Sequence, residues 1–66
     1  MNDFAKTYRG FTYTIDEAYE RVKEIVDQLA WVEPDALQLD IFIGLRDYTM
    51  IQFDGYKYQY LVKIVL

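Results

Sequence analysis

The chain has 66 residues, of which 53% are hydrophobic and 18% aromatic, and it contains no cysteine and no histidine. This length predicts a single domain, residues 1–66, whose core must form without disulfide bridges or a cysteine–histidine zinc site. The net charge of −4 disfavours direct binding to nucleic-acid phosphates, which normally requires a basic patch.

The first predicted element is a short strand over residues 6–13, where bulky and small side chains alternate. Gly10 lies inside this strand and indicates either a bulge or a close approach of another group to the backbone.

A helix is predicted over residues 14–32. Thr14 and Glu17 have the spacing of a capping box, and the glutamate–proline pair at residues 33–34 ends the helix. Apolar residues recur at spacings of three and four and therefore share one face. They are Ile15, Ala18, Val22, Ile25, Val26 and Leu29.

Three further strands are predicted, over residues 36–43, 48–53 and 56–66. Asp54 and Gly55 form the pair favoured in a two-residue type I′ turn, which predicts a hairpin with Phe53 across from Tyr56. The same register places Ile51 across from Tyr58 and Thr49 across from Tyr60.

These elements predict an α+β fold of two layers in the order β-α-β-β-β. A single helix packs on one face of a roughly four-stranded sheet whose last three strands form an antiparallel meander, with the first strand parallel to the second. The helix covers a face that includes Leu37, Leu39, Ile41 and Ile43 and the inward-pointing rings of Tyr56, Tyr58 and Tyr60. The sequence does not determine whether the last strand, which ends at Leu66, leaves one edge open; an open edge there would be able to recruit another chain.

A single helix leaves the second sheet face uncovered. The expected register places Phe42 across from Met50 and Tyr48 across from Leu61, so these four residues form an apolar patch with a polar rim, a candidate for partner binding or dimer formation. Two plainer readings are that the N-terminal segment covers the patch through Phe4, or that these are ordinary exposed apolar residues.

The second candidate surface is the polar side of the helix. Residues 14–36 carry seven acidic and two basic residues, a net charge of −5 that exceeds the negative charge of the whole chain. The acidic residues of the candidate site are Asp16, Glu20, Glu24 and Asp27. The first three are spaced about 6 Å apart along the helix axis, a spacing with which such a row could imitate a line of backbone phosphates. The plainer reading is a solvated helix face that keeps the protein soluble.

Trp31 falls near the end of the helix. If the helix continues through it, Trp31 lies among the acidic residues; if the helix frays near Ala30, Trp31 turns back and closes one end of the core. We favour the core position, because tryptophan is highly buried on average.

Catalysis is not expected. The chain has no serine, cysteine or histidine to act as a nucleophile or general base, and its three glycines are isolated. We predict no catalytic residue, no metal, no cofactor and no membrane contact, and we expect a cytoplasmic protein because the N-terminal residues do not resemble a signal peptide.

The function expected from these features is that of a non-catalytic protein-binding module. It would be a small acidic inhibitor or modulator of a larger enzyme, in sharper form a nucleic-acid-handling enzyme, of the kind encoded by mobile elements such as phages. The alternative is a structural homodimer that pairs through the exposed sheet face.

Overall fold

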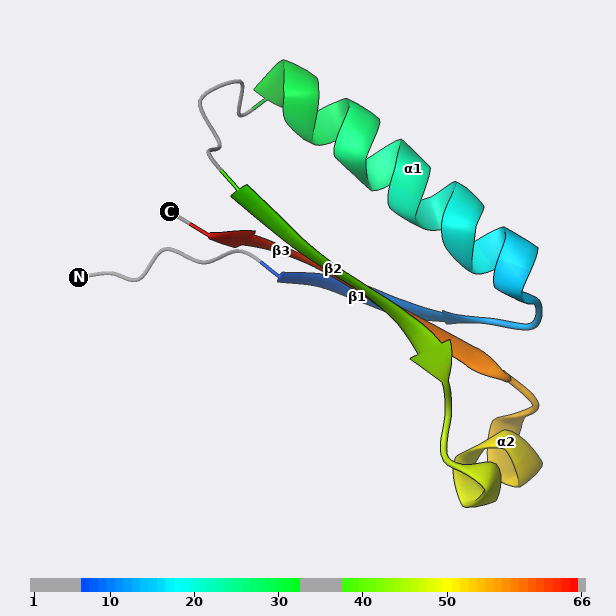
Figure 1. Ribbon diagram of the computed structural model, residues 1–66. Helices are drawn as coiled ribbons and strands as arrows, with labels where there is room; N and C mark the ends of the chain where they lie inside the picture. The colour runs from blue at the N-terminus through cyan, green and yellow to red at the C-terminus, as the bar shows by residue number, and fades with distance from the viewer. Residues whose placement is uncertain (1–6, 33–37, 66) are drawn as a thin grey trace.

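The computed structural model describes residues 7–32 and 38–65 of the chain (Figure 1). Its elements, in chain order, are β1 (Thr7–Thr12), α1 (Ile15–Val32), β2 (Gln38–Leu45), α2 (Tyr48–Asp54) and β3 (Tyr58–Val65). Three residues with predicted positions lie outside the described residues. They are Leu37 and Leu66, predicted on the sheet face under the helix, and Phe4, a candidate to cover the opposite face.

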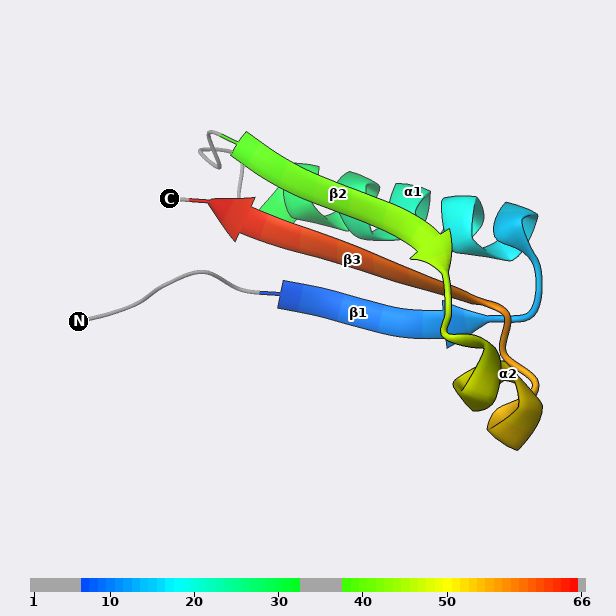
Figure 2. The ribbon, with the colours of Figure 1, turned by 60° about the horizontal axis from the view of Figure 1, so that its bottom comes forward.

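The strands form an antiparallel sheet in the order β1-β3-β2, with β3 in the centre (Figure 2). Both β1 and β2 pair antiparallel with β3, so they run in the same direction, as predicted. The α+β class and the packing of α1 on one sheet face are confirmed, and Figure 1 shows α1 lying over one side of the sheet. The sequence left undetermined whether the last strand has an open edge, and in the structure β3 has a neighbour on each side.

The strand predicted over residues 48–53 is instead the helix α2. The side chain of Asp47 caps its N-terminus by accepting a hydrogen bond from the Thr49 N–H at 2.8 Å. Gly55 ends it in the left-handed conformation, with φ of 84°, and donates its N–H to the Ile51 carbonyl at 2.7 Å. The described residues therefore form three strands, and the hairpin register predicted around Asp54 and Gly55 is wrong.

The N-terminus of α1 has the predicted capping box. The Thr14 Oγ1 accepts the Glu17 N–H at 3.1 Å, and Glu17 Oε1 accepts the Thr14 N–H at the same distance. The helix continues through Trp31 to Val32 instead of fraying at Ala30.

The core lies between α1 and β3. The buried apolar side chains are Ala18, Val22, Leu29, Val62 and Ile64. Partly buried residues pack around them: Ile25, Val26, Leu39, Ile43 and Tyr60. Ile15 was predicted to lie on the apolar face of the helix. It is the first residue of α1 and is 42% exposed.

The tyrosine rings near the C-terminus are half-buried, and Tyr60 packs on the helix side of the sheet against Gly10, its direct partner in β1. A Cβ added to Gly10 would overlap the Tyr60 ring, so the glycine makes room for the aromatic side chain. The register of β1 on β3 is continuous across Gly10. The sequence allowed either a bulge at Gly10 or a close approach of another group to its backbone. The structure has the close approach, made by the Tyr60 ring.

Candidate functional site

The face of the sheet opposite α1 carries a row of three side chains across the strands. Leu61 of β3 lies directly between Arg9 of β1 and Phe42 of β2. Phe11 stands one step further along β1, on the same face as Arg9. Phe42 is 53% and Phe11 48% exposed, and together with Leu61 they line an open groove of about 290 Å³. We call Arg9, Phe11, Phe42 and Leu61 the outer-face group.

The predicted site on this face is correct in part. Phe42 and Leu61 are direct cross-strand partners. Tyr48 and Met50 are not on the sheet, because they belong to α2, so the predicted pairs of Phe42 with Met50 and of Tyr48 with Leu61 do not exist.

Sequence reasoning missed Arg9 and Phe11. They alternate with Tyr8 and Gly10 along a short strand, which indicates a shared face, but no local signal says that this strand lies beside β3.

The acidic residues predicted on α1 are all exposed, on the side of the helix away from the sheet: Asp16, Glu20, Glu24 and Asp27. Arg21 lies 3.6 Å from Glu24 in an exposed ion pair. An ion pair of this kind contributes little to stability and leaves the carboxylate accessible to a partner.

Trp31 belongs to this same surface, and the prediction that it closes the core is wrong. Because α1 continues to Val32, Trp31 keeps the helical phase and is 88% exposed. At 100° per residue, Trp31 and the four acidic side chains fall within an arc of about 80°. We call these five residues the acidic face.

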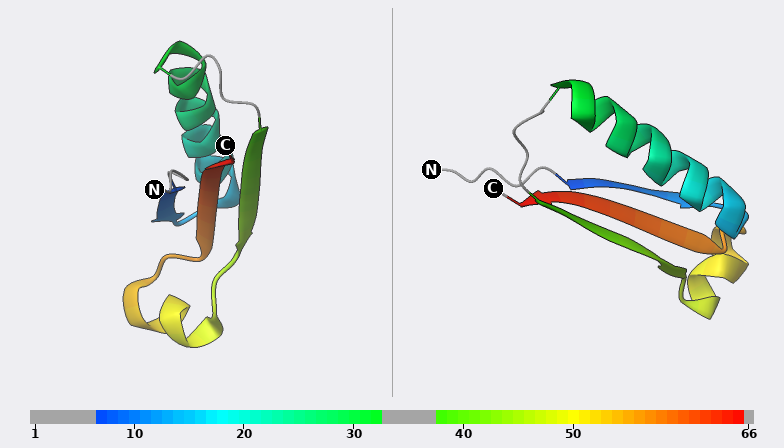
Figure 3. Two further views of the ribbon diagram at one scale, coloured as in Figure 1. Left: turned by 90° about the vertical axis from the view of Figure 1, so that its left-hand side faces the viewer. Right: turned by 45° about the horizontal axis from the view of Figure 1, so that its top comes forward.

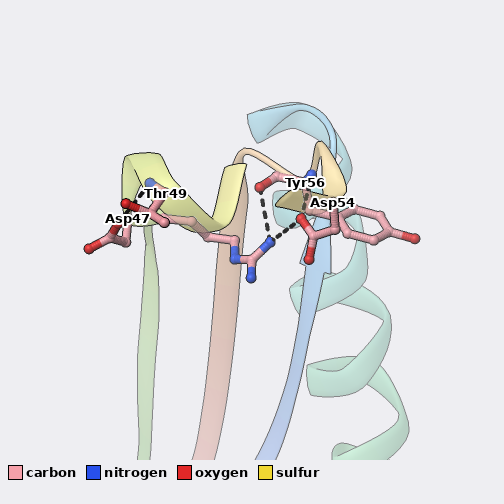
Figure 4. A network of polar contacts seen from close by, with 5 residues as sticks. Asp47, Thr49, Asp54 and Tyr56 are labelled. Atoms are coloured by element: carbon pink, nitrogen blue, oxygen red, sulfur yellow. Dashed lines mark hydrogen bonds and ion pairs between the residues drawn. The ribbon is translucent and has the colours of Figure 1, made fainter. Parts of the chain in front are cut away.

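A third feature lies where the segment containing α2 meets β1. Arg46, whose side chain is 5% exposed, donates from Nη1 to Asp54 Oδ1 at 2.6 Å and to the Tyr56 carbonyl at 3.2 Å. Its guanidinium lies 4.0 Å from the centre of the Phe11 ring. Figure 4 shows Asp54 and Tyr56 on either side of the same guanidinium nitrogen.

This network holds Asp54 in an ion pair. The hydrogen bond from Arg46 and the one from the Tyr56 N–H, at 3.0 Å, hold the pKa of Asp54 below its usual range. Such a carboxylate stays ionised and paired, so it is unsuited to act as a general base near neutral pH. The sequence contained no signal that Arg46 would be buried.

Tyr13 stacks on Tyr56 beside this network, with ring centres 4.5 Å apart. The side-chain hydrogen bond with Tyr56 raises the pKa of Tyr13, and the negative charge of Asp54 acts in the same direction. The stacked pair joins the end of β1 to the short segment that leads into β3.

The helix α2 itself projects from the end of the sheet (Figures 1 and 3). None of its residues is buried, and Tyr48 and Phe53 are 71% and 82% exposed. Met50, the other predicted site residue here, is 43% exposed.

Within residues 7–32 and 38–65, no group of three or more acidic side chains is arranged to hold a metal ion. Neither helix in these residues combines the length and the apolar character needed to cross a membrane. Comparisons with protein-family models, with curated proteins and with solved structures find no match to this chain.

Proposed function

We propose that this chain is a non-catalytic protein-binding module that inhibits or modulates a larger partner through the acidic face of α1. The observation that carries the proposal is Trp31, which is 88% exposed in line with four carboxylates. Tryptophan is one of the residue types enriched at the energetic centre of protein interfaces. The surrounding carboxylates would steer association with a basic partner and align it.

The charge pattern favours one class of partner. Asp16, Glu20 and Glu24 repeat every four residues, about 6 Å along the helix axis, and form a regular line of negative charge. A basic groove that binds a nucleic-acid backbone would accept such a line. The partner we propose is therefore a nucleic-acid-handling enzyme in the cytoplasm, and the chain would be an inhibitor of the kind that mobile elements encode.

Absence of catalysis is part of the same proposal. The chain lacks the residue types of the common nucleophile systems, and Asp54 is held by Arg46. The exposed carboxylates of the acidic face lie on a convex helix, where water screens them.

The test compares capture by the native chain and by charge variants. Tagged protein is incubated with lysate from the source cells at low and high salt, and the bound proteins are identified by mass spectrometry. The triple variant Asp16→Asn, Glu20→Gln, Glu24→Gln removes the row of charges without changing side-chain size. Asp40→Asn, on an exposed residue of β2, is the control for loss of charge elsewhere.

We expect a nucleic-acid enzyme to be captured at low salt by the native chain and by Asp40→Asn, and to be lost at high salt. The triple variant should capture much less of it. Equal capture by the triple variant would show that the acidic face does not bind this partner.

The alternative function is a structural homodimer formed through the outer-face group. Phe42 and Phe11 are each about half exposed on a sheet face that no described element covers. If the alternative is right, Phe42→Asp should convert a dimer into a monomer in sedimentation. A molecular mass unchanged by the substitution would eliminate this interface.

A further inference from the structure

The edge strand β2 exposes apolar side chains on both of its faces. Phe42 on the outer face is 53% exposed, and Ile41 and Leu45 on the other face are 51% and 66% exposed. Ile41 lies directly opposite Val62, which is fully buried beneath α1. Ile41 thus shares the face that α1 packs on, but unlike Leu39 and Ile43 it is not packed against the core.

The outer edge of β2 also has the backbone chemistry to bind another strand. β2 pairs with β3 along its whole length of eight residues, and no strand among the described residues pairs with its other edge. In an antiparallel ladder, alternate N–H and C=O groups point away from the paired neighbour and are free to accept a further strand.

The features that normally prevent edge pairing are few in this strand. Between Gln38 and Leu45 the register is continuous, the sequence contains no proline, and Asp40 is the single charged residue. The opposite edge, β1, is shorter at six residues and includes Arg9 and Gly10.

We propose that β2 pairs antiparallel with β2 of a second copy of this chain, so that two three-stranded sheets become one continuous sheet. A twofold axis perpendicular to the sheet relates the copies and keeps both α1 helices on the same side. Under this symmetry, the numbers of two opposed residues must have an even sum.

The side chains favour the register centred on Phe42. It places Phe42 opposite Phe42 of the second copy, Ile41 opposite Ile43 and Leu39 opposite Leu45. Asp40 faces Gly44, and the two Asp40 residues lie about 14 Å apart along the strands.

The two neighbouring registers are less favourable. Centring the pair on Ile41 brings the two Asp40 residues to about 7 Å and places each beside a phenylalanine. Centring it on Ile43 leaves Leu39 opposite Asp47, so an apolar pair is lost.

This inference goes beyond the proposed function and does not depend on it, because the acidic face of each α1 stays free. It also differs from the alternative dimer. Ile41 and Leu45 lie on the α1 side of the sheet, where a dimer formed through the outer-face group does not reach them.

Disulfide cross-linking tests the register directly, since the native chain has no cysteine. In the proposed pair, the Cα atoms of the two residues at position 42 are about 5 Å apart, within the range of a disulfide. Sheets stacked face to face lie about 10 Å apart, too far for that bond. The variant is Phe42→Cys, and the control is Asp40→Cys, whose Cα atoms would be about 14 Å apart.

We expect mild oxidation to form a covalent dimer of Phe42→Cys at least ten-fold faster than of Asp40→Cys.

Sedimentation supplies the second readout on the native sequence. Ile41→Lys should raise the dimer dissociation constant about ten-fold or more, because symmetry places the substitution in the interface twice. Tyr19→Lys, at a 59% exposed position on α1, should leave it unchanged.

Three results would overturn the proposal: a native chain that is monomeric at all concentrations, equal cross-linking of the two cysteine variants, or a dimer that Ile41→Lys leaves intact. If circular dichroism shows that Ile41→Lys is unfolded, Leu45→Lys at its more exposed position takes its place. Each of these failures would leave partner capture by the acidic face unaffected, so the two proposals are tested separately.

Discussion

Arg46 and Asp54 form an ion pair of 2.6 Å that joins the beginning and the end of the segment containing α2. The arginine side chain is 5% exposed and the aspartate 28%. Because the same guanidinium rests on Phe11, the pair also ties this segment to β1. The position of α2 at the end of the sheet therefore depends on one buried cation.

Replacing that cation should destabilise the fold. We expect Arg46→Met to lower the free energy of unfolding by about 1.5–3 kcal/mol, the usual range for loss of hydrogen bonds to a charged group. Arg21→Met is the control, since it removes an exposed ion pair and should cost about 0–1 kcal/mol. Urea unfolding followed by circular dichroism measures both, and equal losses would contradict a structural role for Arg46.

The contribution of Asp54 should depend on pH. Its pKa is lowered in the folded chain by the hydrogen bond from Arg46, so ionised Asp54 stabilises the fold at pH values above its unfolded pKa of about 3.9. That stability should be lost as the pH falls through the folded pKa. The native chain should therefore be more stable than Asp54→Asn at pH 7, with the difference shrinking below about pH 4. A difference that stays constant from pH 7 to pH 2 would mean that the ionised form of Asp54 is not what stabilises the fold.

Two glycines should respond differently to the same substitution. In Gly10→Ala the new methyl group meets the Tyr60 ring, which packs against the core, and we expect a loss of about 1 kcal/mol. In Gly44→Ala the methyl group meets the ring of Phe42, which is half exposed and free to move aside. Thermal unfolding should show Gly44→Ala unchanged or slightly stabilised, because glycine weakens a strand. The packing of Tyr60 on Gly10 would be refuted if both variants unfolded at the same temperature.

Trp31 should contribute to binding and not to stability. We expect Trp31→Ala to change the free energy of unfolding by no more than about 0.5 kcal/mol, as at other exposed positions. Ile64→Ala, at a position 1% exposed, should cost about 2–5 kcal/mol. Chemical denaturation compares the two variants. A large loss of unfolding free energy in Trp31→Ala would show that Trp31 packs in the core and contradict the prediction.

The features that local sequence determined are those whose signals lie within one element. The capping box at Thr14 and Glu17 and the apolar stripe of α1 each depend on residues three or four apart, and both are present. An apolar stripe on a helix must be buried against another element, and here the predicted strands supply one sheet face. The α+β class and the two layers therefore followed from the same pattern.

At two places the local sequence is compatible with two different structures: Asp54–Gly55 and Trp31. A glycine with positive φ serves both a type I′ turn and a helix C-terminus, and here it ends α2. The average burial of tryptophan favoured the core, but the uninterrupted helix carried Trp31 outward with the acidic residues.

Only the tertiary structure decided which strands are neighbours. β3 lies between β1 and β2, which brings Arg9 and Phe11 beside Leu61 and leaves β2 as an edge. It also buried Arg46 between Asp54 and Phe11, residues far apart in the chain. Periodicity determines which face of a strand is apolar, but strand order depends on pairing between distant segments, and no local spacing encodes that pairing.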